Sequence, residues 1–506
     1  MKLNLKSIVN RADWQGYDLP KFDIPAMVAR TKAAPTWLHM GAGNIFRIFV
    51  AAAQQDLLES GDTDTGIVVY EAFDQGIIPA SFSPYDNLTL GVTLNADGSI
   101  EKRVIASMAD AFCGDFSRLC SIIAAPSLQM ISLTITEKGY ATTTINATPD
   151  DAKTTIEQIA AGLLRRHEAN APPLALVTMD NFAENGEQLK KSVLSVVDAW
   201  LANGKVTPDF KKYVEKQSYP WTMIDKITPR PSEDVAKMLA ETGYEDTAIT
   251  ETENHTFVAS FVNAEAAKYL IIEDDFPNGR PPLEKAGIYI TDRETVRKMD
   301  QMKVCACLNP LHTILAVSGM LLGYPTISAC MKDPALVKLL RKAASEALPV
   351  VPDPGIIKPA DFLNEVLTER FPNPFIPDAP ARIASDTSQK IPIRFGITLK
   401  ERKAKGLPMA DLEAIPMFIA LFLRYRMGIN DKGEKMELSP DPRLPEALNI
   451  LYGIAFGKAA DLTPILSNAT LFGVDLYEVG LAEKVQKNFA QLSSAPDAVA
   501  KALSLF

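Results

Sequence analysis

Short apolar runs alternate with longer amphipathic stretches along the first half of the chain. Four runs have the length and β-branched content of buried strands: "PTWLHMG", "TGIVVYEAF", "LQMISLTITEKGY" and "PPLALVTMDN". Between them lie stretches with helical spacing, such as "IFVAAAQQDLLESG" and "DDAKTTIEQIAAGLLRRHEA". Strands that alternate with helices of this length predict parallel βαβ units, whose ligands bind at the carboxyl ends of the strands.

The pattern changes after about residue 285, where apolar residues recur at helical intervals. Proline-containing breaks separate the stretches "PALVKLLRKAASEALPV", "KPADFLNEVLTERF", "MADLEAIPMFIALFLRYRMG" and "RLPEALNILYGIAFG". Prolines fit helix boundaries because they cannot continue a helix interior. The sequence therefore predicts an α/β domain over residues 1–285 and a mainly α-helical domain over residues 286–506.

A pair of glycines follows the first predicted strand. In "HMGAGNIFR", Gly41 and Gly43 stand between that strand and a helix, where glycines permit a tight turn and let backbone approach a pyrophosphate. Phe46 stands where a third glycine would complete the usual G-x-G-x-x-G pattern, so the fingerprint is partial. Its place in the first βα unit favours a Rossmann-type dinucleotide-binding domain.

The second predicted strand ends in an acidic residue, Glu71, with Asp74 close behind. An acid at this position can accept hydrogen bonds from the adenosine ribose hydroxyls and repel a 2′-phosphate, which favours NAD over NADP. A solvated acid at a strand end is the alternative for both residues. For Arg47, contact with a phosphate and a salt bridge on the helix both stay open.

Composition and charge argue against several classes of protein. A formal net charge of −10 and the lack of a long basic run disfavour a nucleic-acid partner, which needs clustered Lys and Arg. Five cysteines in 506 residues do not suggest a disulfide framework. The N-terminus lacks the apolar core of a signal peptide, and the longest apolar runs are too short to cross a bilayer. We therefore expect a cytoplasmic protein without a membrane partner.

Residues that can move protons gather in the segment "MKVCACLNPLHT". Asn309 and His312 share a face if the segment is helical, and Pro310 fits the first turn of a helix beginning near Asn309. Lys303 lies just upstream. A lysine in a partly closed site can have its pKa lowered toward ~7–8 and act as a base. An amide and an imidazole can then polarise a substrate oxygen.

Two other roles are open to the same segment. Cys305, Cys307 and His312 resemble a zinc ligand set, but C-x-C lacks the usual two-residue gap and no second pair follows. A cysteine nucleophile needs surroundings that lower the pKa of its thiol, and neither cysteine clearly has them. We therefore expect both cysteines to pack in the core and the site to hold no metal.

In order along most of the chain, these motifs resemble those of the mannitol dehydrogenase family, the polyol-specific long-chain dehydrogenases. "HMGAGNIFR" is similar to the family's cofactor loop, "LTITEKGY" to its strand and turn, and "MKVCACLNPLHT" to its catalytic segment. Four further segments also resemble segments of the family: "TMDNFAENG", "IDKITPRP", "IIEDDFPNGRPP" and "ERFPNPFIPDAPARIASDTSQKIP". The resemblance implies a Rossmann-type domain, a helical domain, a site between them, and NAD(P) without a metal.

The resemblance also assigns roles to single residues. The general acid/base is Lys303, with Asp300 as a proton relay. The residues that bind and polarise the reacting oxygen are Asn181, Asn309 and His312, and the basic substrate contacts are Arg382 and Lys390. The cofactor-binding residues are Gly41, Gly43, Asn44, Ile45, Phe46, Arg47 and Glu71.

Two departures from the family pattern bear on the substrate. Lys303 and Asn309 are six residues apart, one more than in the best-known members, and a bulge can absorb the extra residue. "LNPLHT" replaces the usual small residues between Asn and His, which indicates a branch acting on sugar acids. We expect NAD-dependent interconversion of D-fructuronate and D-mannonate. The alternatives are a mannitol 2-dehydrogenase or related polyol dehydrogenase, and a nucleotide-binding sensor without turnover.

Overall fold

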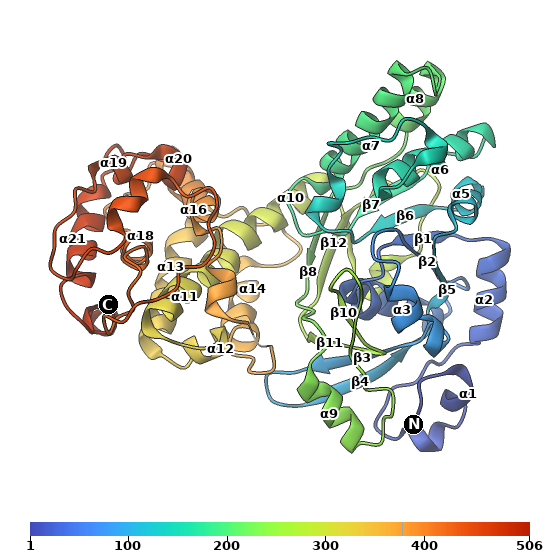
Figure 1. Cartoon of the computed structure of the whole chain (residues 1–506), viewed down its shortest axis with the longest axis horizontal. Helices are drawn as coiled ribbons and strands as arrows, with labels where there is room; N and C mark the ends of the chain where they lie inside the picture. The colour runs from blue at the N-terminus through green and yellow to red at the C-terminus, as the bar shows by residue number, and fades with distance from the viewer. Residues whose placement is uncertain (377) are drawn as a thin grey trace. The chain divides into compact units, whose positions relative to one another are not determined.

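The computed structural model of the chain describes residues 1–376 and 378–506. The chain divides into two compact units, Met1–Arg297 and Lys298–Phe506. The first runs from blue to yellow-green in Figure 1, and the second from yellow to red. The division falls within helix α10 (Arg293–Met302), whereas the sequence pattern placed the boundary after residue 285.

The first unit is built on a parallel sheet of five strands in the order β5-β2-β1-β6-β7. The strands are β1 (Trp37–Met40), β2 (Ile67–Glu71), β5 (Met108–Cys113), β6 (Met130–Leu133) and β7 (Ala175–Thr178). Numbered within this sheet the order is 3-2-1-4-5, which is the order of dinucleotide-binding Rossmann domains. The order reverses between β1 and β6, and ligands bind at such a point.

Both faces of this sheet are buried, which explains why its strands read as nearly continuous apolar runs. Trp37, Ile67 and Val69 face a core that includes α3 (Ala51–Ser60). Leu38 and Val68 face the opposite core. The helices that contribute to the second core are α5 (Phe116–Ala124), α6 (Thr155–Glu168), α7 (Asn185–Ala202) and α8 (Pro208–Glu215). The predicted α/β Rossmann-type fold is thus confirmed.

Smaller sheets and helices complete the first unit (Figure 1). The accessory strands are β3 (Thr89–Leu94), β4 (Ile100–Ile105) and β11 (Phe261–Glu265); β8 (Thr222–Asp225), β12 (Tyr269–Glu273) and β13 (Tyr289–Thr291); and β9 (Thr250–Glu251) with β10 (Phe257–Val258). The remaining α-helices are α1 (Leu5–Ile8), α2 (Ile24–Ala33), α4 (Ile77–Ser81) and α9 (Glu233–Glu241).

The second unit is mainly helical, as expected. Its core contains α11 (Asn309–Leu322) and α18 (Ala414–Tyr425), which are apolar and buried along nearly their whole length. The other helices are α12 (Ile327–Cys330), α13 (Pro334–Ala347), α14 (Pro359–Glu365), α15 (Pro380–Ile383), α16 (Thr387–Ile391), α17 (Ile397–Ala404), α19 (Thr463–Leu466), α20 (Ala469–Phe472), α21 (Ala482–Leu492) and α22 (Ala498–Leu505).

One expected helix is absent from this unit. Within the segment "RLPEALNILYGIAFG", residues Glu446–Leu451 form only a 3₁₀ helix. Gly453 and Gly457 follow it with φ values of +77° and +71°, in the left-handed region that ends helices. The apolar spacing of this segment therefore predicted the wrong element.

One helical stretch, Arg293–Leu322, is long and apolar enough to cross a membrane by length and composition. It exceeds the length expected from its apolar run because α10, a π-helical turn and α11 follow one another. However, 78% of its most apolar window is buried within the structure. We therefore interpret it as a core helix.

The two glycines of the loop after β1 should respond differently to substitution. Gly41 has a φ of +110°, and a Cβ there would lie 2.4 Å from the carbonyl oxygen of Thr134. Gly41→Ala should destabilise the first unit by about 1–3 kcal/mol from backbone strain alone. Gly43→Ala is the matched control, because nothing lies within 4 Å of its Cβ position. Chemical denaturation measures both, and equal losses would contradict the assignment.

Candidate active site

The glycine loop lies where the strand order of the parallel sheet reverses. Gly41 crosses the end of β6 so closely that only glycine fits beside Thr134. Gly43 leaves open space around its Cα. The helix after the loop begins at Asn44, so a phosphate can approach its free N–H groups there. The loop therefore fits the pyrophosphate of a dinucleotide.

The carboxylate of Glu71 ties the end of β2 to this loop. Its Oε2 accepts the N–H of Ala42 at 2.7 Å, and its Oε1 accepts the N–H groups of Phe73 at 2.9 Å and Asp74 at 3.1 Å. Burial raises the pKa of Glu71, and the three hydrogen bonds oppose that shift. A carboxylate offers about four acceptor positions. One is therefore left for a ribose hydroxyl, and that contact stays a prediction.

Arg47 is fully buried and its side chain serves the fold. Its Nε donates to the hydroxyl of Thr89 at 3.0 Å, and its Nη2 donates to the carbonyl of Ala259 at 2.9 Å. The guanidinium also lies over the Phe82 ring, 5.2 Å from its centroid. Among the described residues no carboxylate forms an ion pair with it, and burial lowers its pKa to about 10. Arg47 thus forms no salt bridge on the helix and offers no exposed cation to a phosphate.

The other loop side chains are also engaged with the protein. Asn44 donates from Nδ2 to the carbonyl of Pro229 at 3.2 Å. Phe46 is buried and stacks on His39, with ring centroids 3.9 Å apart. Ile45 packs against the core of the first unit. These residues therefore hold the loop, and their backbone N–H groups are the contacts available to a cofactor.

In the second unit, Lys303 begins a π-helical turn, Lys303–Cys307. The N–H of Leu308 donates to the carbonyl of Lys303, five residues back, at 3.2 Å. The four-residue pattern resumes where the N–H of His312 donates to Leu308 at 2.9 Å. A π-helical turn of this kind holds one more residue than an α-helical turn. Lys303 is 1% exposed, so its amine does not lie in bulk water.

Asn309 and His312 lie on the first turn of α11, as their spacing predicted. Arg394 reinforces this helix start, because its Nη1 donates to the carbonyl of Asn309 at 3.2 Å and to the hydroxyl of Thr313. Burial lowers the pKa of Arg394 to about 10, and no carboxylate pairs with it among the described residues. An unpaired cation therefore lies beside the Asn309–His312 segment.

Arg382 is already bound to an acid. Its Nε and Nη2 donate to Oδ1 of Asp378 at 2.9 and 2.5 Å. On the other side, Oδ2 of Asp378 lies 3.1 Å from Nε2 of His312. The carboxylate thus joins two of the predicted site residues. The side chain of Arg382 is still 69% exposed.

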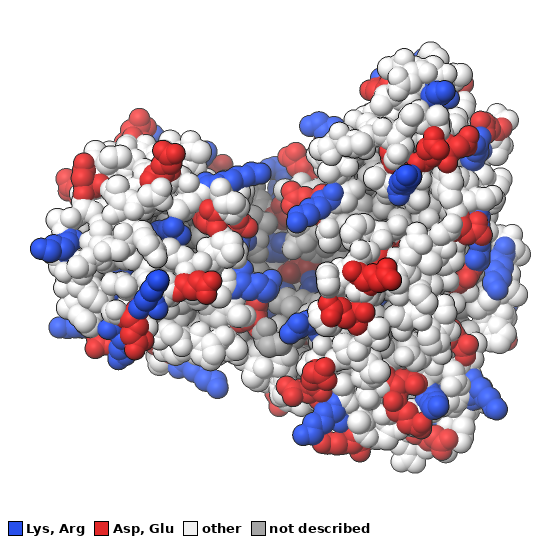
Figure 2. Space-filling model, in the orientation of Figure 1, with Lys and Arg blue, Asp and Glu red and all other residues white. Residues whose placement is uncertain are grey.

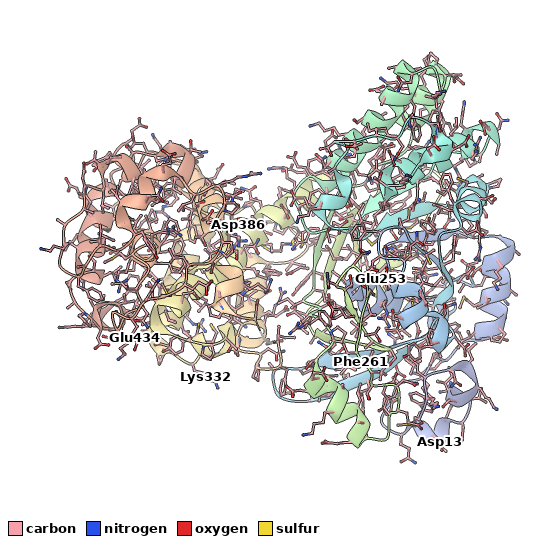
Figure 3. All side chains as sticks on the ribbon, in the orientation of Figure 1. Asp13, Glu253, Phe261, Lys332, Asp386 and Glu434 are labelled. Atoms are coloured by element: carbon pink, nitrogen blue, oxygen red, sulfur yellow. The ribbon has the colours of Figure 1, made fainter. Side chains whose placement is uncertain are left out.

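Lys390 lies on α16, which begins after Asp386 (Figure 3). Its Nζ donates to the carbonyls of Ile383 at 2.9 Å and Ser385 at 2.6 Å. Burial lowers the pKa of Lys390 to about 8, and the charge of Arg394 adds to that effect. Lys390 therefore changes charge close to neutral pH.

Asn181 belongs to the first unit, exposed in the loop after β7. The preceding Asp180 fixes this loop by accepting the N–H groups of Ile135 at 3.0 Å and Thr136 at 2.9 Å and the hydroxyl of Tyr140 at 2.7 Å. The two segments "TITEKGY" and "TMDN" thus meet at the carboxyl ends of β6 and β7. The roles of Asn181, and of Asp300 on α10, stay predictions.

Comparison with known proteins identifies the family. Residues 35–285 match the mannitol dehydrogenase Rossmann domain, and residues 295–493 match the mannitol dehydrogenase C-terminal domain. A D-mannonate oxidoreductase of Thermotoga maritima is 47% identical, over 99% of this chain and 98% of that protein. The chain belongs to the mannitol dehydrogenase family. A mannitol 2-dehydrogenase of Phaeosphaeria nodorum is 28% identical over 87% of this chain and 76% of its own.

Solved structures of similar fold extend over both units. A substrate-free D-sorbitol dehydrogenase has a TM-score of 0.78 at 24% identity, with 94% of each chain covered. The mannitol 2-dehydrogenase of Pseudomonas fluorescens, in a ternary complex with NAD and D-mannitol, has a TM-score of 0.74 at 23% identity, covering 100% of this chain and 99% of that one. At these identities the likeness concerns the fold.

Two residues of the candidate site were not identified from the sequence. Asp378 stands in "FIPDAPAR", four residues before Arg382, a spacing at which an acid and an arginine can pair on a helix. Arg394 stands in "KIPIRFG", four residues after Lys390. The spacing was visible in both cases. Their contacts with His312 and Asn309 depend on tertiary packing.

The cysteines of the catalytic segment pack in the core, as the sequence led us to expect. Cys305 and Cys307 are 4% and 0% exposed, and burial raises the pKa of each thiol to about 12. No cluster of three or more metal-binding side chains occurs among the described residues. Neither thiol is therefore a nucleophile at neutral pH, and the zinc hypothesis gains no support.

Alkylation should therefore leave the catalytic segment unmodified. At pH 7 iodoacetamide should react first with the partly exposed Cys113, because thiolate fraction and access set the rate. Peptide mass spectrometry locates the label, and Cys113→Ser is the matched control that should take up almost none. Rapid labelling of Cys305 or Cys307 in the folded Cys113→Ser protein would refute the core assignment.

Proposed function

We propose that the chain is an NAD-dependent oxidoreductase that interconverts D-fructuronate and D-mannonate. The 47% identity along nearly the whole chain to a D-mannonate oxidoreductase carries this proposal. Mannitol 2-dehydrogenases are more distant, at 28–29% identity. Interconversion of D-mannitol and D-fructose is therefore the second candidate.

The proposed cofactor is NAD. The cradle between Gly41 and Asn44 fits a pyrophosphate, and Glu71 keeps one acceptor position for a ribose hydroxyl. Residues 72–76, "AFDQG", include no basic side chain that could pair with a 2′-phosphate. A negative carboxylate without a neighbouring cation disfavours NADP.

When bound, NADH supplies the hydride that reduces the ketone carbon of the substrate. Lys303, as the ammonium, gives a proton to the oxygen that becomes the alcohol; in oxidation the neutral amine takes the hydroxyl proton back. The amide of Asn309 donates a hydrogen bond to the same oxygen and stabilises its developing charge. Burial of Lys303 limits exchange of its proton with bulk water.

A sugar acid adds a carboxylate that needs a cation. Arg382, Lys390 and Arg394 lie near one another in the second unit, since the charges of Arg394 and Arg382 both lower the pKa of Lys390 and that of His312. On the face shown in Figure 2, basic side chains of this unit are interspersed with acidic ones. The cation cluster is therefore local and suits a small anion.

A substrate panel tests the reaction and its base. We expect NADH to form with D-mannonate much faster than with D-mannitol, D-altronate or D-arabinitol, and NADP to be a poor substitute for NAD. Lys303→Ala should lower kcat by about 10²–10⁴, because general acid–base catalysis contributes on that order. Faster turnover of D-mannitol would favour the second candidate. Dinucleotide binding without any turnover would indicate a sensor.

The pH dependence of substrate binding tests the role of Lys390. Its ammonium is present below a pKa of about 8 and lost above it, so the KM for D-mannonate should rise as pH increases through 8. Lys390→Met should raise that KM about 10- to 100-fold at pH 7, since a hydrogen bond to a charged group contributes ~1.5–3 kcal/mol, and should remove the pH dependence. Lys405→Met, at an exposed site of the same unit, is the control. An unchanged profile in Lys390→Met would exclude the role.

A further inference from the structure

The carboxylate of Asp378 lies between His312 and Arg382 in the second unit. Its Oδ2 is 3.1 Å from Nε2 of His312, and its Oδ1 accepts two hydrogen bonds from Arg382. The side chain of Asp378 is 8% exposed and that of His312 is 14% exposed. The pair is therefore largely shielded from water. In such an interior a charged hydrogen bond is strong and specific in direction.

The position of Asp378 is fixed by the packing around it. Its carbonyl accepts the N–H of Ile327 at 2.8 Å, at the start of α12. Two residues later, Pro380 packs on Gly319 of α11, where an added Cβ would lie 3.0 Å from the proline ring. Gly319 lies seven residues after His312 and therefore on the same face of α11. Close packing of α15 on that face holds the carboxylate beside the imidazole.

This contact decides which nitrogen of His312 carries the proton. An ionised carboxylate only accepts hydrogen bonds. Burial alone would raise the pKa of Asp378, but His312 and Arg382 together hold it below its ordinary value. The Nε2 atom must therefore be the donor. Burial lowers the pKa of His312 below its ordinary value, which favours the neutral ring. In a neutral ring with a proton on Nε2, Nδ1 is a bare acceptor.

We propose that Asp378 is a positioning residue that fixes His312 in the Nε2–H tautomer and compensates the charge of Arg382. The inference rests on the proposed function, because it assigns this tautomer to the binding of an open-chain sugar acid. With Nδ1 unprotonated, His312 accepts a hydrogen bond from a substrate hydroxyl. The reacting oxygen is then left to Lys303 and the amide of Asn309. The carboxylate of the substrate is left to the unpaired cations Lys390 and Arg394.

Nitrogen NMR tests the tautomer without any turnover. The chain has four histidines, so a sample labelled with ¹⁵N in the imidazole rings gives few signals, and His312→Gln identifies the relevant pair. We expect the wild-type protein to show a protonated Nε2 and an unprotonated Nδ1 at pH 7. A wild-type His312 protonated on Nδ1 alone would overturn the proposal without recourse to a variant.

Asp378→Asn tests the consequence for the reaction. An amide has one accepting and one donating end, so it cannot accept hydrogen bonds from both His312 and Arg382. We expect kcat/KM for D-mannonate to fall about 10- to 100-fold, as when the partner that orients a metal-binding imidazole is removed. The loss should appear mainly in KM, because His312 binds a hydroxyl that does not react. The proportion of the His312 tautomers should change in the same sample, and unchanged spectra and kinetics would overturn the proposal.

Asp431→Asn is the matched control. Asp431 is also buried in the second unit, but its carboxylate accepts the N–H groups of Val499 and Ala500 at the start of α22. The Asp431→Asn change should lower stability and leave kcat/KM and the His312 signals unchanged. An equal loss of kcat/KM would show that the effect of Asp378→Asn is structural and would refute the proposal. The protein could show the Nε2–H tautomer and yet turn over no substrate. That result would refute the proposed function and the positioning role of Asp378 in it, but not the pairing of Asp378 with His312.

Discussion

A polar side chain on a buried, largely apolar helix is most stable where a partner satisfies it. On helix α11, Asn309 and His312 lie on the first turn, next to such partners. Arg394 binds the backbone of that turn, and Asp378 binds its imidazole. The rest of the helix is held by hydrophobic burial. The candidate site residues are therefore positioned by a hydrophobic core.

In the first unit, buried carboxylates also hold backbone segments in place, because they accept hydrogen bonds from the N–H groups of loops. Glu71 binds the glycine loop after β1, and Asp180 binds the turn after β6. Both acids follow or end a strand of the parallel sheet, at the edge where ligands bind. Without these carboxylates the loop N–H groups would donate to water. The carboxylates therefore fix the loop conformation before a cofactor binds. Preorganisation of this kind lowers the entropic cost of binding.

The sequence was informative wherever burial imposed a pattern. Four strands of the parallel sheet were predicted because both of their faces are apolar, whereas β5 was missed because Asp110 interrupts its short run at the sheet edge. The segment with Lys303 and His312 was identifiable from its residue types. The partnership of His312 with Asp378 was not, because the packing of α15 on Gly319 creates it. For the same reason the sequence left open whether Arg47 contacts a phosphate or forms a salt bridge, because its burial depends on contacts distant in sequence.

The π-helical turn at Lys303 separates the orientation of that lysine from the packing of α11. Because the wide turn closes at Leu308 and the four-residue pattern resumes at His312, the helix that follows is regular within the hydrophobic core. A change in the width of this turn would rotate Lys303 relative to Asn309 and leave the packing of α11 in place.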